Sequence, residues 1–324
     1  MMRGLLALLA VLVLQLTGCA VPHTHGRFLA AVPHTTAPLP PRTKIFLVAG
    51  GVEVANFAAE VIAQRRFWLA RGYSPDEIAC YWARPTRAAF RRDRAQYREL
   101  AAELRACHPA SAGLLREHLQ LTSRRAPPFV YLYVSSHGSA DILPEDVPED
   151  SLLPTERALF DQTVIQLGSG PGRGVSPVRL AMALRSGADP DTLVFSPRIL
   201  RDLLLAFPPA TRKLVILQAC HSGGFLSDAR SERRADTLTT VPGLTAIASA
   251  RFDRTSFGCD SGARMTYFGA AYQRLLTAHS AAQRALDDPG LDWPALFESL
   301  RLEIAALERR VDVQASLPQL LRTP

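Results

Sequence analysis

The sequence predicts an α/β fold with a mostly parallel sheet and helices on both of its faces. Short apolar runs alternate with longer segments of helical spacing, which is typical of such folds. Of the 324 residues, 48% are hydrophobic, which is ample for a sizeable core. There is no low-complexity tract, so the composition does not indicate global disorder.

Five strands are expected from short apolar runs. The first ends in a pair of glycines that open a loop, and the third is dense in aromatic and β-branched residues. The runs are residues 44–49, 78–82, 128–135, 213–218 and 244–250.

Helices are expected between these strands. Gly72 ends the first helix, while Ser196 caps another whose first turn holds Pro197. The helical segments are residues 56–71, 86–107, 114–121, 196–207, 267–278 and 294–310.

The amino terminus has the pattern of a targeting signal. A basic Arg3 precedes an apolar run at residues 5–14, which is too short to span a bilayer comfortably. The run leads to Leu-Thr-Gly-Cys19, which resembles a bacterial lipobox. This resemblance implies a lipoprotein signal peptide at residues 1–18 and a diacylglycerol on Cys19. An ordinary signal peptide with a chance cysteine is the alternative.

The resemblance also implies a location. The residue after Cys19 is Ala20 and not an aspartate. In lipoproteins of this kind, that choice implies the outer membrane of the bacterial cell envelope. Residues 19–42 are expected to form a proline-containing linker, and residues 43–324 a single domain. We interpret the linker histidines as solvated, because no cysteine or carboxylate accompanies them at ligand spacing; they are His23, His25 and His34.

The charge of the chain is +7, and nearly all of the positive charge is arginine. Arginine pairs such as those at residues 65–66 and 233–234 are spread along the chain and do not form one stripe. Nucleic-acid binding needs a clustered basic face with stacking aromatics, so we expect no nucleic-acid partner. A weak attraction to anionic lipids is compatible with this charge.

Five cysteines are present. Beside Cys19 and Cys220, the chain holds Cys80, Cys107 and Cys259. Cys80 and Cys107 lie at the ends of predicted elements and are the easiest pair to join in an oxidising compartment, which leaves one cysteine over. No CxxC motif is present, so neither a structural zinc site nor a thioredoxin-type motif is supported. We expect no metal and no cofactor.

A long segment at about residues 140–191 interrupts the alternation of strands and helices. It holds a glycine-rich stretch at residues 168–174, which lacks the Lys-Ser/Thr ending of a phosphate-binding loop. We interpret the segment as an insertion that acts as a mobile lid, parts of which fold locally.

Two predicted strands end in short polar motifs. One is followed by His137 and the other by Cys220. Functional groups gather at the carboxyl ends of parallel strands, so we expect these side chains at one edge of the sheet. An imidazole can take the proton of a thiol, and Gly138 and Gly223 allow close backbone approach. The joint pattern predicts a nucleophile and its base.

Both motifs resemble the catalytic segments of the legumain family and, more broadly, the caspase-like clan of cysteine peptidases. The matching segments are Tyr-Leu-Tyr-Val-Ser-Ser-His137-Gly-Ser and Gln-Ala-Cys220-His-Ser-Gly, and further similarity covers most of residues 44–276. The resemblance implies a caspase-like three-layer sandwich and an endopeptidase. It makes Cys220 the nucleophile, His137 the base and Asn56 the residue that orients the histidine. Backbone N–H groups of Cys220 and Gly138 would form the oxyanion hole.

The specificity pocket departs from the family pattern. Where legumains have an arginine, a glutamate and an aspartate, this chain has Ala58, Gln218 and Asp260, the last after a one-residue gap. We expect these residues and Ser136 to contact a peptide or protein substrate. Gln218 could bind a carboxamide. Asp260 alone could favour a basic residue, whereas Arg251 or Arg254 could favour an acidic one. A transamidase with the same dyad and a catalytically dead, peptide-binding lipoprotein are the alternative functions.

Overall fold

The fold is taken from a computed structural model of the chain. It describes residues 32–51, 54–83, 94–140, 163–167, 182, 185–187, 195–227, 237–259, 263–280 and 291–324. Predictions that fall on Cys19, on the signal peptide and on most of the 140–191 insertion lie outside these ranges.

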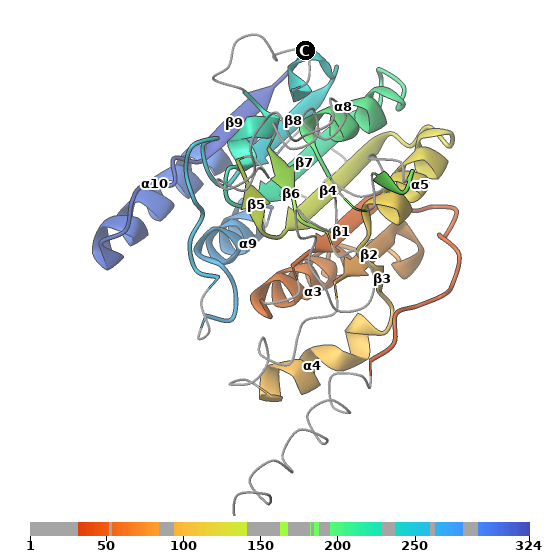
Figure 1. Ribbon diagram of the computed structural model, residues 1–324, viewed down its shortest axis with the longest axis horizontal. Helices are drawn as coiled ribbons and strands as arrows, with labels where there is room; N and C mark the ends of the chain where they lie inside the picture. The colour runs from red at the N-terminus through yellow and green to blue at the C-terminus, as the bar shows by residue number, and fades with distance from the viewer. Residues whose placement is uncertain are drawn as a thin grey trace, which may run out of the picture.

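A seven-stranded sheet forms the centre of the molecule, in the order β3-β2-β1-β4-β7-β8-β9 (Figure 1). All neighbouring strands are parallel except β8 and β9, so the predicted mostly parallel sheet is confirmed. The strands are β1 Ile45–Ala49, β2 Ile78–Trp82, β3 His108–Pro109, β4 Phe129–Ser135, β7 Arg212–Gln218, β8 Leu244–Ala248 and β9 Gln319–Arg322.

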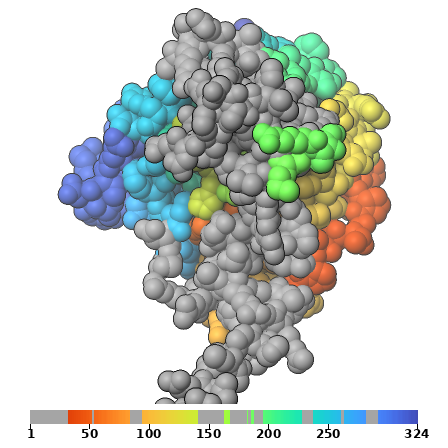
Figure 2. All heavy atoms as spheres, in the orientation of Figure 1, coloured from red at the N-terminus to blue at the C-terminus, as the bar shows by residue number. Residues whose placement is uncertain are grey.

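Helices cover both faces of the sheet and make a three-layer α/β sandwich. Helices α5 and α8 pack on one face, while α3, α4, α9 and α10 belong to the other (Figure 1). In the space-filling view α10 lies at one side of the molecule and α5 and α8 at the other (Figure 2). The helices are α3 Asn56–Ala70, α4 Arg94–Leu104, α5 Ala112–Ser123, α8 Pro197–Leu205, α9 Tyr267–Ser280 and α10 Trp293–Val311.

The central strands are buried on both faces, which explains their continuous apolar sequences. In β1, Phe46 and Val48 pack toward α5 and α8, whereas Ile45 and Leu47 pack toward α3 and α9. All four side chains are fully buried. Successive residues of a strand point to opposite faces, so one apolar run supplies both halves of the core.

The start of α8 confirms the capping predicted from the sequence. The Ser196 side chain accepts a hydrogen bond from the Ile199 amide, 3.5 Å away, and Pro197 occupies the first turn. The hydroxyl thus satisfies an amide that has no partner within the helix.

The described part of the linker packs against the β2–β3 edge of the sheet. His34 Nε2 lies 2.7 Å from the Trp82 carbonyl oxygen, and the Thr35 amide donates to the Cys107 carbonyl oxygen at 2.9 Å. Our interpretation of His34 as solvated is therefore wrong, because Trp82, the last residue of β2, offers it both a backbone carbonyl oxygen and an aromatic ring. A Cys80–Cys107 disulfide closes the same edge, as the sequence favoured.

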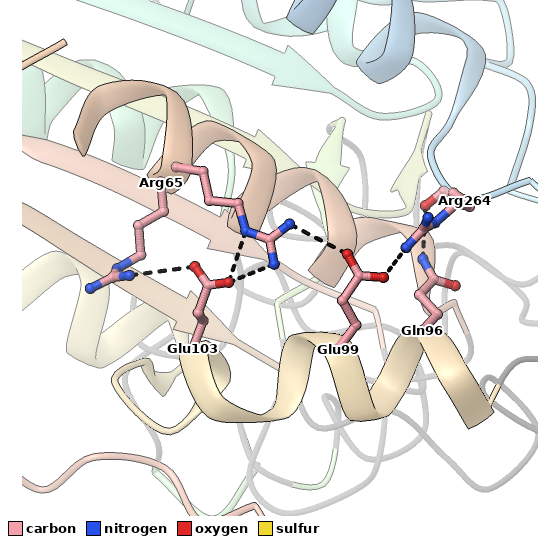
Figure 3. Close-up of polar contacts among 6 residues, drawn as sticks. Arg65, Gln96, Glu99, Glu103 and Arg264 are labelled. Atoms are coloured by element: carbon pink, nitrogen blue, oxygen red, sulfur yellow. Dashed lines mark hydrogen bonds and ion pairs between the residues drawn. The ribbon is translucent and has the colours of Figure 1, made fainter. Parts of the chain in front are cut away.

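Helix α4 is held against α3 by ion pairs on the surface (Figure 3). Arg66 pairs with Glu103 at 2.6 Å and with Glu99 at 3.4 Å, and Glu99 also pairs with Arg264. Gln96 donates to the Arg264 carbonyl oxygen at 3.2 Å. Exposed pairs contribute at most about 1 kcal/mol each. Their consequence here is geometric, because they tie the segment before α9 to α4.

Three features of the sheet were not expected. The edge strands β3 and β9 were not predicted, and β9 runs antiparallel to β8. A two-stranded sheet joins β5 (Gly138–Ser139) to β6 (Val164–Ile165), which lies within the insertion. The helix predicted at residues 86–107 is described from Arg94 to Leu104.

Candidate functional site

The candidate site lies where β4 and β7 end. These strands are parallel neighbours, and their last residues, Ser135 and Gln218, are paired in register. His137 and Cys220 follow two residues later on each chain segment. His137 and Cys220 thus lie just beyond the carboxyl ends of two neighbouring strands.

The backbone segments that carry His137 and Cys220 touch. A Cβ atom built on Gly138 would lie 1.9 Å from the Cys220 carbonyl oxygen and 3.1 Å from the Ala219 Cβ. No side chain fits at position 138 without a shift of the backbone. The glycine expected from the sequence therefore allows the two strand ends to approach each other closely.

The Cys220 thiol is half-buried and contacts the backbone of Ser256. Its Sγ lies 3.3 Å from the Ser256 nitrogen, which donates to it, and 3.5 Å from the Ser256 carbonyl oxygen. Burial raises the pKa of Cys220, and the backbone hydrogen bond of Ser256 lowers it only in part. The thiol thus needs a base to become a nucleophile. Ser256 was not predicted, because no local pattern marks a residue that acts through its backbone.

The His137 ring lies beside the start of α3. Phe57 packs edge-on against it, with ring centroids 5.2 Å apart. A Cβ on Gly51 would lie 3.1 Å from His137 Cδ2 and 2.8 Å from the Phe57 ring, and Gly51 has a φ of +72°. The turn after β1 therefore uses a glycine both for its backbone conformation and for the space that the imidazole occupies.

Asn56, the first residue of α3, is buried next to Phe57. Its Nδ2 donates to the Gly258 carbonyl oxygen at 2.6 Å, while its Oδ1 is buried without a partner. Buried polar atoms are usually paired, so this oxygen is available to accept a hydrogen bond. Ala58 is also buried, in the apolar core, and carries no polar group toward the site.

Ser136 is buried and its hydroxyl donates to the Gln166 carbonyl oxygen. Gln166 also donates its amide to the His137 carbonyl oxygen at 2.9 Å. A Cβ on Gly50 would lie 2.3 Å from the same Gln166 oxygen. The structure thus uses Ser136 to fasten the described part of the insertion to the ends of β1 and β4.

The backbone turns sharply after Cys220. His221 has a φ of 58°, its amide donates to the Arg254 carbonyl oxygen at 2.8 Å, and its Nδ1 lies 2.8 Å from the Phe252 carbonyl oxygen. A left-handed conformation is uncommon outside glycine and occurs at turns and functional sites. The bonds to residues 252 and 254 hold the loop that carries Ser256 beside the thiol.

Gln218 is the last residue of β7 and is fully buried. The Ser135 hydroxyl lies 2.9 Å from the Gln218 side-chain oxygen and 2.6 Å from Glu60 Oε2. The Gln218 side-chain nitrogen is buried without a partner. Neither Glu60 nor Ser135 was singled out from the sequence, because their contact with Gln218 joins three distant segments.

Asp260 lies outside the described residues, so its predicted place in the pocket is not described. Within the described ranges, no group of three or more histidine, cysteine or acidic side chains is arranged to hold a metal ion. The helices of those ranges include none with the length and apolar character needed to cross a bilayer.

Comparison with protein-family models gives no match, and comparison with curated proteins gives none either. Among solved structures, the chain is similar to a structural-genomics protein from Geobacter sulfurreducens, with a TM-score of 0.47, 12% identity, and coverage of 87% of this chain and 94% of that chain. It is also similar to caspase-1 from Spodoptera frugiperda, with a TM-score of 0.42, 11% identity, and coverage of 90% and 92%.

Proposed function

We propose that the chain is a cysteine endopeptidase with Cys220 as nucleophile and His137 as base. The observation that carries this proposal is the contact between the two strand ends, where Gly138 lies against the Cys220 carbonyl group. A thiol and an imidazole on adjacent, touching segments are the minimum required for nucleophilic attack on a peptide carbonyl.

In the first step, His137 takes the proton of the Cys220 thiol, and the sulfur forms a bond to the peptide carbonyl carbon. The raised pKa of Cys220 makes this proton transfer necessary at neutral pH. The carbonyl π electrons move to oxygen, and backbone N–H groups of Cys220 and Gly138 stabilise the resulting charge.

In the second step, the tetrahedral intermediate collapses and the C–N bond breaks. The protonated His137 gives its proton to the leaving amine, and an acyl group remains on the sulfur. Water, deprotonated by His137, then attacks the thioester and releases the carboxylic acid. The thiol is thereby restored.

Asn56 is proposed to orient the histidine. Its unpartnered Oδ1 can accept a hydrogen bond from the protonated ring, because Phe57 of the same helix already packs against His137. Such a bond would fix the ring and stabilise the imidazolium formed in the first step.

The activity can be tested on a peptide library by mass spectrometry of the new termini. We expect cleavage by the wild type and by a Cys259→Ala variant, and none by Cys220→Ala. Cys259 is a matched control because it is also half-buried and outside the disulfide. Equal cleavage by Cys220→Ala, or no cleavage by the wild type, would contradict the proposal.

We also propose that a lipid on Cys19 anchors the chain to the outer membrane. The support is the sequence Leu-Thr-Gly-Cys19 after an apolar run. Metabolic labelling with an alkyne fatty acid tests this proposal. Label should be present on the wild type and absent from Cys19→Ser, and equal label on both would contradict it.

A further inference from the structure

The hydroxyl of Ser249 bonds both backbone groups of Ala219, the residue before Cys220. The Ser249 Oγ accepts from the Ala219 amide at 3.0 Å and donates to the Ala219 carbonyl oxygen, also at 3.0 Å. Both residues are fully buried, so no water competes for these bonds. One side chain therefore clamps the backbone immediately before the proposed nucleophile.

The clamp takes the place of backbone hydrogen bonds where the register of β7 and β8 ends. These strands are parallel neighbours (Figure 1), and the Ser249 amide still donates to the Leu217 carbonyl oxygen at 2.9 Å. Two residues further along β7, Ala219 turns its N–H and C=O to the same side as Leu217, because alternate residues of a strand direct these groups alike. Their partner is now the Ser249 hydroxyl, which is a donor and an acceptor in one atom.

A second serine lies against the clamp, and together the two hydroxyl groups fix the direction of their protons. Ser222 Oγ lies 3.5 Å from Ser249 Oγ, a long hydrogen bond, and accepts from the Ala250 amide at 3.3 Å. The one proton of Ser249 goes to the Ala219 carbonyl oxygen, which can only accept. Ser222 is therefore the donor to Ser249, and both hydroxyl groups are satisfied.

The clamped carbonyl group of Ala219 belongs to the same peptide unit as the Cys220 amide. This peptide bond is trans and planar, so its C=O and its N–H point in opposite directions. The Ala219 oxygen points toward β8, where Ser249 lies, so the Cys220 N–H points toward β4 on the other side of β7. Gly138, which follows β4, lies against the Cys220 carbonyl group on that side.

The Cys220 amide is available to bind a developing negative charge. Within the ranges that the structure describes, it donates to no atom of another residue. Burial raises the pKa of Cys220, and hydrogen bonds from the backbone of Ser256 and of Cys220 itself lower it in part. The Cys220 N–H therefore faces its own sulfur, on which the tetrahedral intermediate would form.

We propose that Ser249 is a positioning residue, which fixes the peptide unit between Ala219 and Cys220 and so aims the Cys220 N–H at the oxyanion of the tetrahedral intermediate. The inference rests on the proposed peptidase function. An oxyanion donor is effective because it is held in place before the charge develops, and a peptide unit that can tilt loses this advantage. Ser249 should therefore affect the transition state and not the binding of the substrate.

The first test is the steady-state kinetics of Ser249→Ala, expressed per titrated active site. The variant removes both bonds to Ala219 and leaves its carbonyl oxygen with the Ser222 amide alone, 3.4 Å away. For the peptide that the wild type cleaves best, we expect kcat to fall by about tenfold while KM stays unchanged. Ser249→Cys keeps a similar side-chain volume and weakens both bonds, so it should lower kcat even if Ser249→Ala does not fold.

Two reagents separate the effect on the oxyanion from any effect on the thiol. A peptide aldehyde with the same sequence bonds to the sulfur through its carbonyl carbon and moves the carbonyl electron pair to oxygen, so its affinity for Ser249→Ala should fall by about tenfold. Iodoacetamide is attacked at a saturated carbon, releases iodide and forms no oxyanion. The rate and the pH profile of Cys220 alkylation, mapped by mass spectrometry, should therefore stay unchanged.

Ser196→Ala is the matched control. Ser196 is also a fully buried serine, and its hydroxyl accepts from a backbone amide at the start of α8. This variant should leave kcat and the aldehyde affinity per titrated site unchanged, whatever its effect on stability. An equal loss in Ser196→Ala would assign the effect of Ser249→Ala to lost stability and overturn the inference.

Failure of this inference can be distinguished from failure of the peptidase proposal. An unchanged aldehyde affinity in the Ser249 variants overturns the inference and leaves the peptidase proposal intact. Equal losses of aldehyde affinity and of alkylation rate do the same, because they indicate a general disturbance of the site. Absence of wild-type turnover on a peptide library, together with absence of Cys220 labelling by peptidyl inhibitors, overturns the peptidase proposal itself and this inference with it.

Discussion

Strand β7 carries a buried polar side chain at each end, and the two ends differ in how these groups are satisfied. At the amino end, the Lys213 Nζ donates to the carbonyl oxygens of Thr211, Pro242 and Pro208 at 2.8, 3.0 and 3.2 Å. At the carboxyl end, Gln218 leaves one end of its amide without a partner, and so does the nearby Asn56.

We propose that the difference separates a structural end of the sheet from the end that holds the candidate site. An ammonium has three donors, and Lys213 uses all of them on backbone oxygens, so nothing remains for a ligand. Unpaired buried groups destabilise a fold and need a reason to be retained. Ligands of open parallel sheets bind at the carboxyl ends of the strands, where the two unpaired amides lie.

Removal of the proposed base should have the largest effect. We expect His137→Ala to lower kcat/KM by about a thousandfold, because general base catalysis and thiol activation are lost together. His221→Asn is the control, since His221 is also next to Cys220 and asparagine tolerates its left-handed backbone. If His221→Asn lowered kcat/KM more than His137→Ala does, the assignment of His137 as the base would be wrong.

The second largest loss of activity is expected when a methyl group is added at Gly138, between the two strand ends. We expect Gly138→Ala to lower kcat/KM by about a hundredfold, because the new Cβ must displace the Cys220 carbonyl group. Ser139→Ala, one residue later, should have little effect. Full activity of Gly138→Ala would show that the contact between the strand ends is not needed.

The amino end of β7 should respond in stability and not in activity. Lys213→Met removes a donor from three carbonyl oxygens, of which only the Pro208 oxygen keeps another donor, the Thr211 amide, and it removes a buried charge, whose pKa is lowered by burial. We expect the free energy of unfolding, measured with urea, to fall by about 2 kcal/mol. The kcat per titrated active site should stay unchanged, and a selective loss of kcat would break the comparison between the two ends.

The β2–β3 edge should show the smallest effect, as a dependence of stability on pH. Burial, followed by the charges of His118 and His34, lowers the pKa of His108 from 6.5 to about 4. The unfolded chain therefore binds more protons in this range, so stability is complete above pH 6.5 and is lost as the pH falls toward 4. We expect a loss of about 1 kcal/mol by pH 5, measured by urea unfolding.

His108→Gln is the variant that checks this effect, because it keeps a polar side chain and cannot titrate. Its stability should vary less between neutral and acidic pH than that of the wild type. An equal pH dependence in both proteins would place the acid-sensitive groups elsewhere in the molecule.

The central strands could be predicted from the sequence because burial on both faces leaves a continuous apolar run. Residues Ile78–Trp82 form β2 at the bounds that the sequence indicated. The edge strand β9 could not be predicted, because Gln319–Arg322 is half-buried and has no apolar run of that kind. The alternation of strands and helices similarly indicated both layers of helices before any contact was known.

For the candidate site, local sequence motifs indicated His137 and Cys220. The residues around them are identified only by contacts between segments that are distant in the sequence. Glu60, Ser135 and Gln218 are far apart in the chain, and only the β4–β7 register and the position of α3 bring them together. Ser256 meets the thiol through its backbone, for which a sequence has no signature. Packing of chain segments, and not residue type, decides such contacts.

Labelling of the thiol tests the central claim most directly. The wild type and His137→Ala are treated under reducing conditions with peptidyl acyloxymethylketones of varied P1, and the adduct is mapped by mass spectrometry. We predict an adduct on Cys220 and none on Cys259 in the wild type, with the Cys220 adduct lost in His137→Ala. No adduct on Cys220 with any P1 residue, or equal labelling in His137→Ala, would contradict the assignment of this pair as nucleophile and base.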